Sequence, residues 1–137
     1  MDDLVCQITS GQLSAEIVLD TPDVIGFLDH RPVFKGHVLV CPRRHAADLA
    51  DLASDLVEPL FAAVQDVSVA LPRALGCQGT FVAINNQVSQ SVAHLHVHVV
   101  PRTKGDGLRG FLWPRTRYDG DAEIADYGAR IRAAIDH

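Results

Sequence analysis

Short apolar stretches bounded by turn residues recur along the chain and predict β-strands. The predicted strands span residues 15–19, 24–29, 37–41, 79–84 and 92–100. The first two are separated by Thr21-Pro22-Asp23, which has the composition of a turn, so they are expected to form a hairpin. Residues 1–14 carry only a weak pattern and predict no regular element.

Between the third and fourth strands the apolar period changes to three and four residues, which predicts an amphipathic helix. Its apolar positions are Leu56, Leu60, Val64, Val67 and Leu71. Ser54 is the predicted N-cap and Gly76 the predicted stop. A second helix follows from Ile124, Tyr127, Ile131 and Ile135. The order β-β-β-α-β-β-α predicts an α+β fold with helices packed on an antiparallel sheet.

The last predicted strand carries three histidines in strict alternation with apolar residues. Because side chains alternate between the two faces of a strand, His94, His96 and His98 are expected on one face and Leu95 and Val97 on the other. Three polar rings inside an apolar run are costly unless they serve a purpose. Histidine titrates near neutral pH and ligates metals, so catalysis or metal binding is the expected role.

Length, charge and cysteine content narrow the class of protein. The chain has 137 residues, 47% of them hydrophobic, which fits one globular domain with a real core. A net charge of -5 argues against a general nucleic-acid binder. Three scattered cysteines predict free thiols. No apolar run is long enough to cross a bilayer and no signal segment is evident, so a cytoplasmic protein without a membrane partner is expected.

Several motifs together resemble the histidine triad (HIT) family. They are residues 37–45 (HVLVCPRRH), Asn85-Asn86, Gln90-Ser91-Val92 and residues 94–102 (HLHVHVVPR). The family pattern His-φ-His-φ-His-φ-φ, in which φ is apolar, is met at every position. The resemblance runs from about residue 16 to residue 102.

The resemblance implies a five-stranded antiparallel sheet with a main helix packed on it, followed here by a C-terminal helix. One HIT domain is expected over residues 1–137, with a core at about 5–102; the basic segment plus helix at 103–137 follows from charge and periodicity and not from the resemblance. Family members are usually homodimers that bind purine nucleotides and cleave at the α-phosphate. The implied substrates are nucleoside phosphoramidates or dinucleoside polyphosphates.

The resemblance also assigns catalytic roles. His96, the middle histidine, is the expected nucleophile and forms a nucleotidyl-histidine intermediate that water resolves. A neutral imidazole can attack phosphorus without a metal, so no catalytic cofactor is expected. His98 and Ser91 would donate to a phosphate oxygen or to the leaving group, His94 would orient the site, and His37 would add a polar group. Histidine at the third position favours a hydrolase over the sugar-nucleotide transferase branch, which has glutamine there.

Five further positions match nucleotide-binding positions of the family. Asp29 would accept hydrogen bonds from the ribose hydroxyls, although a turn residue at a strand end is the alternative interpretation. Phe27, together with Ile25, would form part of the apolar base slot. Asn85 and Gln90 bound a loop expected near the ribose and the phosphate, and are expected to contact the nucleotide.

One departure concerns metal binding. Many bacterial relatives begin with Cys-x-x-Cys, which joins histidines around a structural zinc, whereas this chain has Asp3 and Cys6. Cys6, His45 and His94 could supply three ligands, with Asp3 a candidate fourth. Because a structural zinc site normally has four ligands, the sequence favours a protein without zinc.

Two alternatives to a hydrolase remain open at this point. One is a nucleotide-binding or sensing module with slow turnover. The other is a metal-binding protein that uses His94, His96 and His98 as a histidine-rich face.

The segment after the triad is a further open question. It is basic, and we hypothesise that it holds the leaving half of an anionic substrate, the alternatives being a solvated loop or a dimer contact. Its residues are Arg102, Lys104, Arg109, Trp113, Arg115 and Arg117.

Overall fold

The computed structural model describes residues 3–108 and 115–135. The chain divides into two compact units, residues 1–106 and 107–137, and each is described by itself. The first unit carries all the strands found among these described residues and confirms the predicted α+β class.

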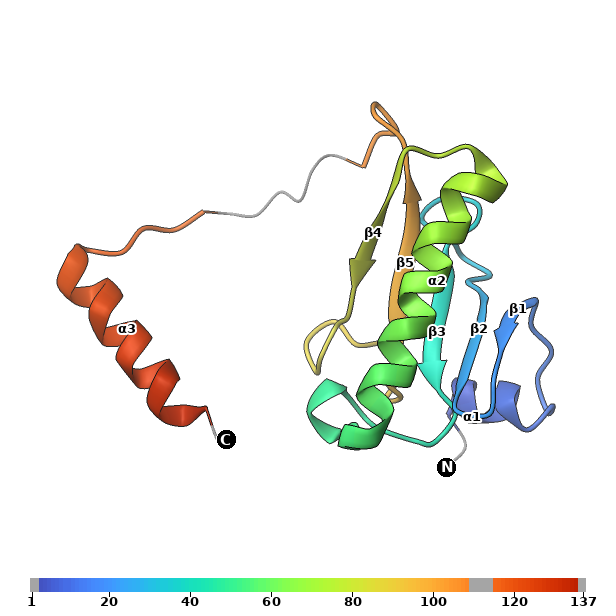
Figure 1. Cartoon of the computed structure of the whole chain (residues 1–137), viewed down its shortest axis with the longest axis horizontal. Coiled ribbons are helices and arrows are strands. Elements are labelled where there is room, and N and C mark those ends of the chain that lie inside the picture. Colours follow the sequence, from blue (N-terminus) through green and yellow to red (C-terminus); the bar gives the residue numbers. More distant parts are fainter. Residues whose placement is uncertain (1–2, 109–114, 136–137) are drawn as a thin grey trace. The chain divides into compact units, whose positions relative to one another are not determined.

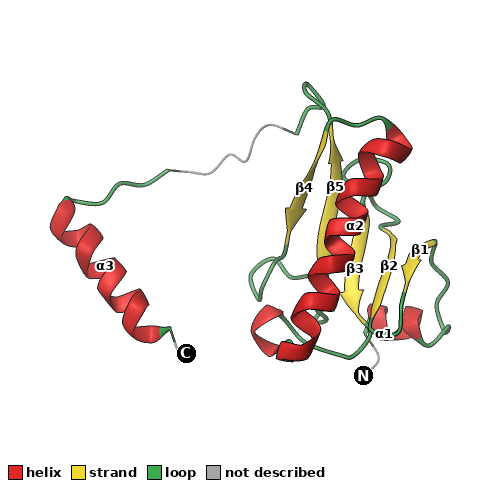
Figure 2. Cartoon of the chain, in the orientation of Figure 1, coloured by secondary structure: helices red, strands yellow, loops and turns green. Residues whose placement is uncertain are grey.

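The sheet of the first unit has five antiparallel strands (Figures 1 and 2). They are β1 (Ile17–Asp20), β2 (Val24–Leu28), β3 (Val38–Pro42), β4 (Gly79–Ala83) and β5 (Val97–Arg102). Their order across the sheet is β1-β2-β3-β5-β4, so β5 lies between β3 and β4. The predicted hairpin of the first two strands is confirmed, since β1 pairs with β2.

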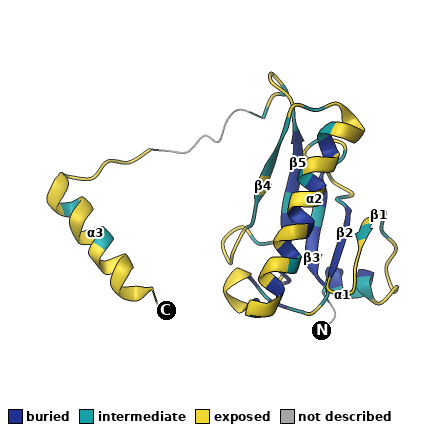
Figure 3. Ribbon diagram, viewed as in Figure 1, coloured by how far each residue is buried: buried dark blue, intermediate teal, exposed yellow. Residues whose placement is uncertain are grey.

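Helix α2 (Val57–Leu75) lies across one face of this sheet (Figure 1). Its apolar stripe is buried, with Leu60 completely inaccessible to solvent, and it packs on strand residues such as Val40 and Val97. Figure 3 shows the resulting layer of buried residues between helix and strands. Gly76 ends the helix at φ 72°, a left-handed conformation that glycine adopts without steric cost.

The start of α2 differs from the prediction. Ser54 does not cap the helix but begins a short 3₁₀ turn, Ser54–Leu56, which leads directly into it. Another 3₁₀ turn, Leu49–Asp51, precedes it and is capped by Asp48. The N-cap prediction was wrong because the chain enters α2 through helical turns and so needs no side-chain cap at Ser54.

The opposite face of the sheet is partly covered by α1 (Leu4–Thr9), a helix that the sequence analysis missed. Val5 and Ile8 are buried and pack with Ile25, Phe27 and Cys41. A helix of six residues is too short to display a repeated apolar period. The one sequence feature that could have predicted α1 was Asp3, a good N-cap residue. Its carboxylate accepts a hydrogen bond from the Cys6 N–H and caps the first turn.

The histidine strand is displaced from its predicted position. It begins at Val97 instead of residue 92, because Leu95 donates its N–H to the carbonyl of Ala46 and not to a neighbouring strand. It also continues through Pro101, which was expected to end it. At Pro101 β5 pairs only with β4, so the missing N–H of proline breaks no ladder bond to β3.

The second unit contains α3 (Asp121–Ala134), the predicted C-terminal helix. None of its residues is buried within the described parts of the chain, and Ile124 and Ile131 are exposed. The Arg130 guanidinium lies 4.5 Å from the centre of the Tyr127 ring and pairs with Asp126. None of the helices in residues 3–108 and 115–135 is both long enough and apolar enough to cross a membrane.

Candidate active site

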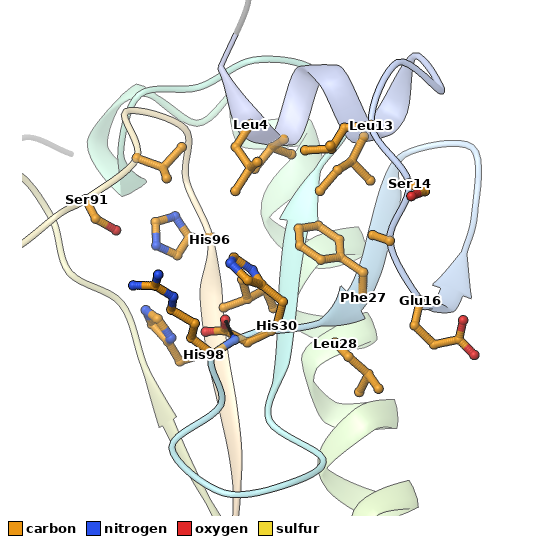
Figure 4. A pocket seen from close by; sticks show the side chains of 17 residues that line it. Leu4, Leu13, Ser14, Glu16, Phe27, Leu28, His30, Ser91, His96 and His98 are labelled. Carbon is orange, nitrogen blue, oxygen red and sulfur yellow. Dashed lines mark hydrogen bonds between the residues drawn. The ribbon is translucent and has the colours of Figure 1, made fainter.

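A cavity of about 890 Å³ lies between α1, the end of β2 and the segment that leads into β5. One part of its wall is apolar and comes from α1 and β2, including Leu4, Ile8 and Phe27. The polar part carries His96 and His98. Figure 4 shows these two rings along one side, with Phe27 on the opposite side. The cavity therefore offers an apolar slot beside a row of imidazole rings.

His96 is held in one tautomer by the backbone. Its Nδ1 lies 2.7 Å from the carbonyl oxygen of His94, and because a carbonyl only accepts, Nδ1 must carry the proton. In the neutral ring Nε2 then bears a free lone pair. His96 is mostly buried but lines the cavity, so this lone pair is available to an electrophile.

His98 and His37 form a linked pair beside His96. The Nε2 of His37 lies 3.0 Å from the Nδ1 of His98, and the ring centres of His96 and His98 are 5.1 Å apart. Burial and the neighbouring His96 and His37 lower the pKa of His98 to about 4. Burial also lowers the pKa of His37, although the charge of Asp29 opposes this. Both rings are therefore neutral near pH 7.

Three of the predicted nucleotide contacts line the same cavity, namely Phe27, Asp29 and Ser91. Asp29 follows β2, and its carboxylate accepts the Arg31 N–H at 2.9 Å, which fixes the turn after the strand. The ribose assignment and the alternative turn role of Asp29 are thus compatible, because a carboxylate has more than one acceptor site.

Other predicted contacts lie elsewhere. Ile25 is buried in the core shared with α1, and neither Ile25 nor Asn85 lines the cavity. The Gln90 side-chain amide donates to the carbonyl of Ala47 and accepts a hydrogen bond from the Gln87 N–H. These bonds stabilise the loop that contains Gln90 itself. Ser89, in that loop, has φ 60°, a left-handed conformation that glycine adopts more easily. The roles assigned to Asn85 and Gln90 stay predictions.

Sequence reasoning missed two charged residues of the cavity wall, Glu16 and Arg31. Arg31 is the single arginine or lysine among the described residues that line the cavity, and it lies two residues after Asp29. By contrast, Arg102 of the basic segment pairs with Asp106 at 2.6 Å. Arg109 and Trp113 lie outside the described residues. The sequence feature that could have pointed to Arg31 was its position two residues after Asp29, the proposed ribose contact.

His94 points away from the cavity toward a second polar cluster. Its Nε2 lies 2.8 Å from the Pro42 carbonyl oxygen and must donate to it, and its Nδ1 faces Asp3, Cys6 and His45. Burial alone would raise the pKa of Asp3, but the Cys6 N–H and the charge of His94 outweigh it and keep that pKa below its ordinary value.

This cluster is chemically suited to a zinc ion. One ligand atom from each of the four residues lies within 4.8 Å of the other three. Carboxylate oxygen, thiolate and two imidazole nitrogens are ligand types that zinc accepts in tetrahedral sites. The hydrogen bond from His94 to Pro42 is the kind of outer contact that orients a metal-binding imidazole. The structure thus brings together all four groups that the sequence named.

Comparison with known proteins identifies the family. Residues 10–105 match the model of the HIT domain, which is more than half of the chain. The chain belongs to the HIT family. The adenosine 5′-monophosphoramidase hnt1 of Schizosaccharomyces pombe is 30% identical over 137 residues, covering 98% of this chain and 99% of the relative.

Solved structures agree with this assignment. A crystal structure of a HIT family member from Bacillus subtilis has a TM-score of 0.91 and 29% identity, covering 100% of this chain and 99% of that one. A Zn-bound histidine triad family protein from Mycobacterium smegmatis has a TM-score of 0.74 and 32% identity, covering 98% and 99% of the two chains. The predicted HIT fold is confirmed, and the family includes nucleotide hydrolases such as the S. pombe enzyme.

Proposed function

We propose that this protein is a nucleotide hydrolase that cleaves at the α-phosphate of purine nucleotides through a nucleotidyl intermediate on His96. The observation that carries the proposal is the hydrogen bond from His96 Nδ1 to the His94 carbonyl, which leaves Nε2 as a nucleophile in the cavity. The similarity to an enzyme named as an adenosine 5′-monophosphoramidase supports the same reaction class.

The rest of the cavity suits a nucleotide. The apolar wall that includes Phe27 would receive the base, and Asp29 would accept hydrogen bonds from the ribose. Ser91 and His98 would donate to phosphate oxygens. Splitting the displacement into attack by His96 and hydrolysis of the intermediate makes each step easier than direct attack by water.

The function is tested with a panel of substrates of different leaving groups. Adenosine and guanosine phosphoramidates, dinucleoside tri- and tetraphosphates and aryl esters of AMP are assayed with the wild-type protein. We expect release of the nucleoside monophosphate with at least one class, and weaker binding of its 2′,3′-dideoxy form. Absence of turnover with every class would contradict the proposal and favour a sensing module.

Arg31 is the residue that we propose to contact a polyphosphate leaving group, because it lines the cavity and carries a positive charge. In Arg31→Ala we expect kcat/KM for a dinucleoside tetraphosphate to fall roughly tenfold or more, while the phosphoramidate is little affected, because a hydrogen bond to a charged group contributes about 1.5–3 kcal/mol. The loss should shrink as salt is added. The control is Arg73→Ala, which changes an exposed arginine of α2. Equal losses on both substrates would exclude contact between Arg31 and the leaving group. If only the double variant Arg115→Ala/Arg117→Ala lost activity selectively on the tetraphosphate, that contact would belong to the basic segment instead.

The Asp3, Cys6, His45 and His94 cluster offers four ligand groups in one place, which supports a structural zinc site, whereas the sequence favoured a protein without zinc. Elemental analysis should find about one zinc per chain, and Asp3→Ala should lose it, whereas Asp66→Ala on the exposed face of α2 should not. Saturating zinc at about a hundred times its Kd would add about 2.7 kcal/mol of stability, visible as a higher Tm.

We expect the folded, chelated protein to keep its turnover rate, because the proposed nucleophile is an imidazole and not a metal-bound hydroxide. Loss of turnover in a protein that remains folded, with recovery on adding a divalent ion, would contradict a purely structural zinc.

A further inference from the structure

A chain of hydrogen bonds leads from a surface loop to the cavity. The backbone N–H of Val33 donates to the Nδ1 of His37 at 3.1 Å. The Nε2 of His37 lies 3.0 Å from the Nδ1 of His98. The Nε2 of His98 is buried and has no hydrogen-bond partner among the described residues. Each hydrogen bond therefore fixes which nitrogen of the next ring carries the proton, and His98 Nε2 remains as the atom that can bond to a ligand.

The direction of the chain follows from its first member. A backbone amide can only donate, so the Nδ1 of His37 must be the unprotonated nitrogen. The proton of a neutral His37 is then on Nε2, which donates to the Nδ1 of His98. A neutral His98 in turn carries its proton on Nε2. The lowered pKa values of both rings agree with the neutral forms that this reasoning requires.

A competing arrangement is present in the same structure. The Asp29 carboxylate lies 3.7 Å from the Nδ1 of His37. A proton on that nitrogen would donate to Asp29, His37 Nε2 would become an acceptor, and His98 would place its proton on Nδ1. The cavity would then face a bare lone pair on His98 Nε2. The Val33 N–H excludes this arrangement, because two donors cannot point at each other.

We propose that the backbone amide of Val33, acting through His37, holds His98 in the tautomer whose Nε2–H points to a ligand; the ligand atom that accepts from it is the anionic phosphate oxygen already assigned to His98 under the proposed function. The second part rests on the proposed function. Val33 and His37 are positioning residues, whereas His98 touches the substrate. A buried N–H without a partner is unfavourable, so an anionic oxygen that accepts from it is bound preferentially.

The inference is tested by the tautomer of His98, measured by ¹⁵N NMR of histidine-labelled, ligand-free protein. Wild type is expected to show protonated Nε2 and unprotonated Nδ1. Val33→Pro deletes the donor, and we expect the His98 proton to shift toward Nδ1. Val33→Ala is the matched control: it trims the half-exposed side chain but keeps the N–H, so it should show the wild-type tautomer. A wild-type His98 protonated on Nδ1, or an unchanged tautomer in folded Val33→Pro, would overturn the inference.

A second pair of variants covers the case in which proline disrupts the loop. His37→Leu removes the donor to His98 Nδ1 and should let both tautomers of His98 populate. His37→Gln retains an N–H near the same place and should restore the single tautomer. Equal tautomer populations in these two variants would likewise overturn the inference.

Kinetics then separate the inference from the proposed function. Relative to Val33→Ala, Val33→Pro should lower phosphoramidate turnover by about 10²-fold, the loss typical of removing one donor to developing charge. If wild type hydrolyses no nucleotide, the proposed function fails, but the NMR result still decides the tautomer. If the tautomer shifts and turnover does not, the donor role of His98 toward phosphate is wrong.

Discussion

Replacing His96 with alanine is expected to lower turnover by roughly 10³- to 10⁶-fold, because loss of an essential nucleophile removes the covalent route itself. The imidazole of His96 donates from Nδ1 to the His94 carbonyl and exposes Nε2 to the cavity, a geometry that no other described residue of the cavity wall shares. The rate is measured with the best substrate of the panel, under single-turnover conditions.

Binding and folding serve as the controls for this variant. His96→Ala should keep its circular dichroism spectrum and bind the nucleotide product within a few-fold of wild type, since the base and ribose contacts lie on other residues. A variant that is folded, binds nucleotide and retains a tenth or more of the wild-type rate would exclude His96 as the nucleophile.

Truncating the centre of the core is expected to produce the largest loss of stability. Leu60→Ala should lower the free energy of unfolding by about 2–5 kcal/mol, because Leu60 is completely buried between α2 and the sheet and the cavity left behind fills only partly. Denaturant titration with a linear extrapolation measures the change.

The matched control is Val69→Ala on the exposed side of the same helix. Val69 is 47% exposed, and alanine has the higher helix propensity, so this change should stay within about 0.5 kcal/mol of wild type. Similar losses in the two variants would mean that α2 does not pack on the sheet through the face described here.

The layers of the fold were predictable because long periodic patterns encode them. The stripe from Leu56 to Leu71 repeats over four turns, so it placed α2 on the sheet from the sequence alone. Helix α1 was not predictable in this way, since six residues show no repeat. The start of β5 was misplaced because the alternation of apolar residues continues through His94 and His96, while the hydrogen bonds that define a strand begin only at Val97.

The sequence predicted those features of the site that depend on side-chain alternation along a strand. It did not predict the features that depend on backbone geometry. Alternation correctly separated the histidine side of the strand from Leu95, Val97 and Val99, which are buried in the core. It did not reveal that His94 contacts the Asp3 cluster while His96 and His98 line the cavity. Nor does any pattern of side chains encode the Val33 amide, because its contribution comes from a backbone N–H.

The most direct test of the central claim is to trap the covalent intermediate on His96. Wild-type protein is mixed with substrate, quenched within one turnover in base, where phosphorus–nitrogen bonds to imidazole survive, and mapped by mass spectrometry. We predict that the peptide containing residues 94–98 gains the mass of one nucleoside monophosphoryl group on His96, and that His96→Ala shows no adduct. Full turnover without any adduct, or an adduct on a different residue, would contradict the account.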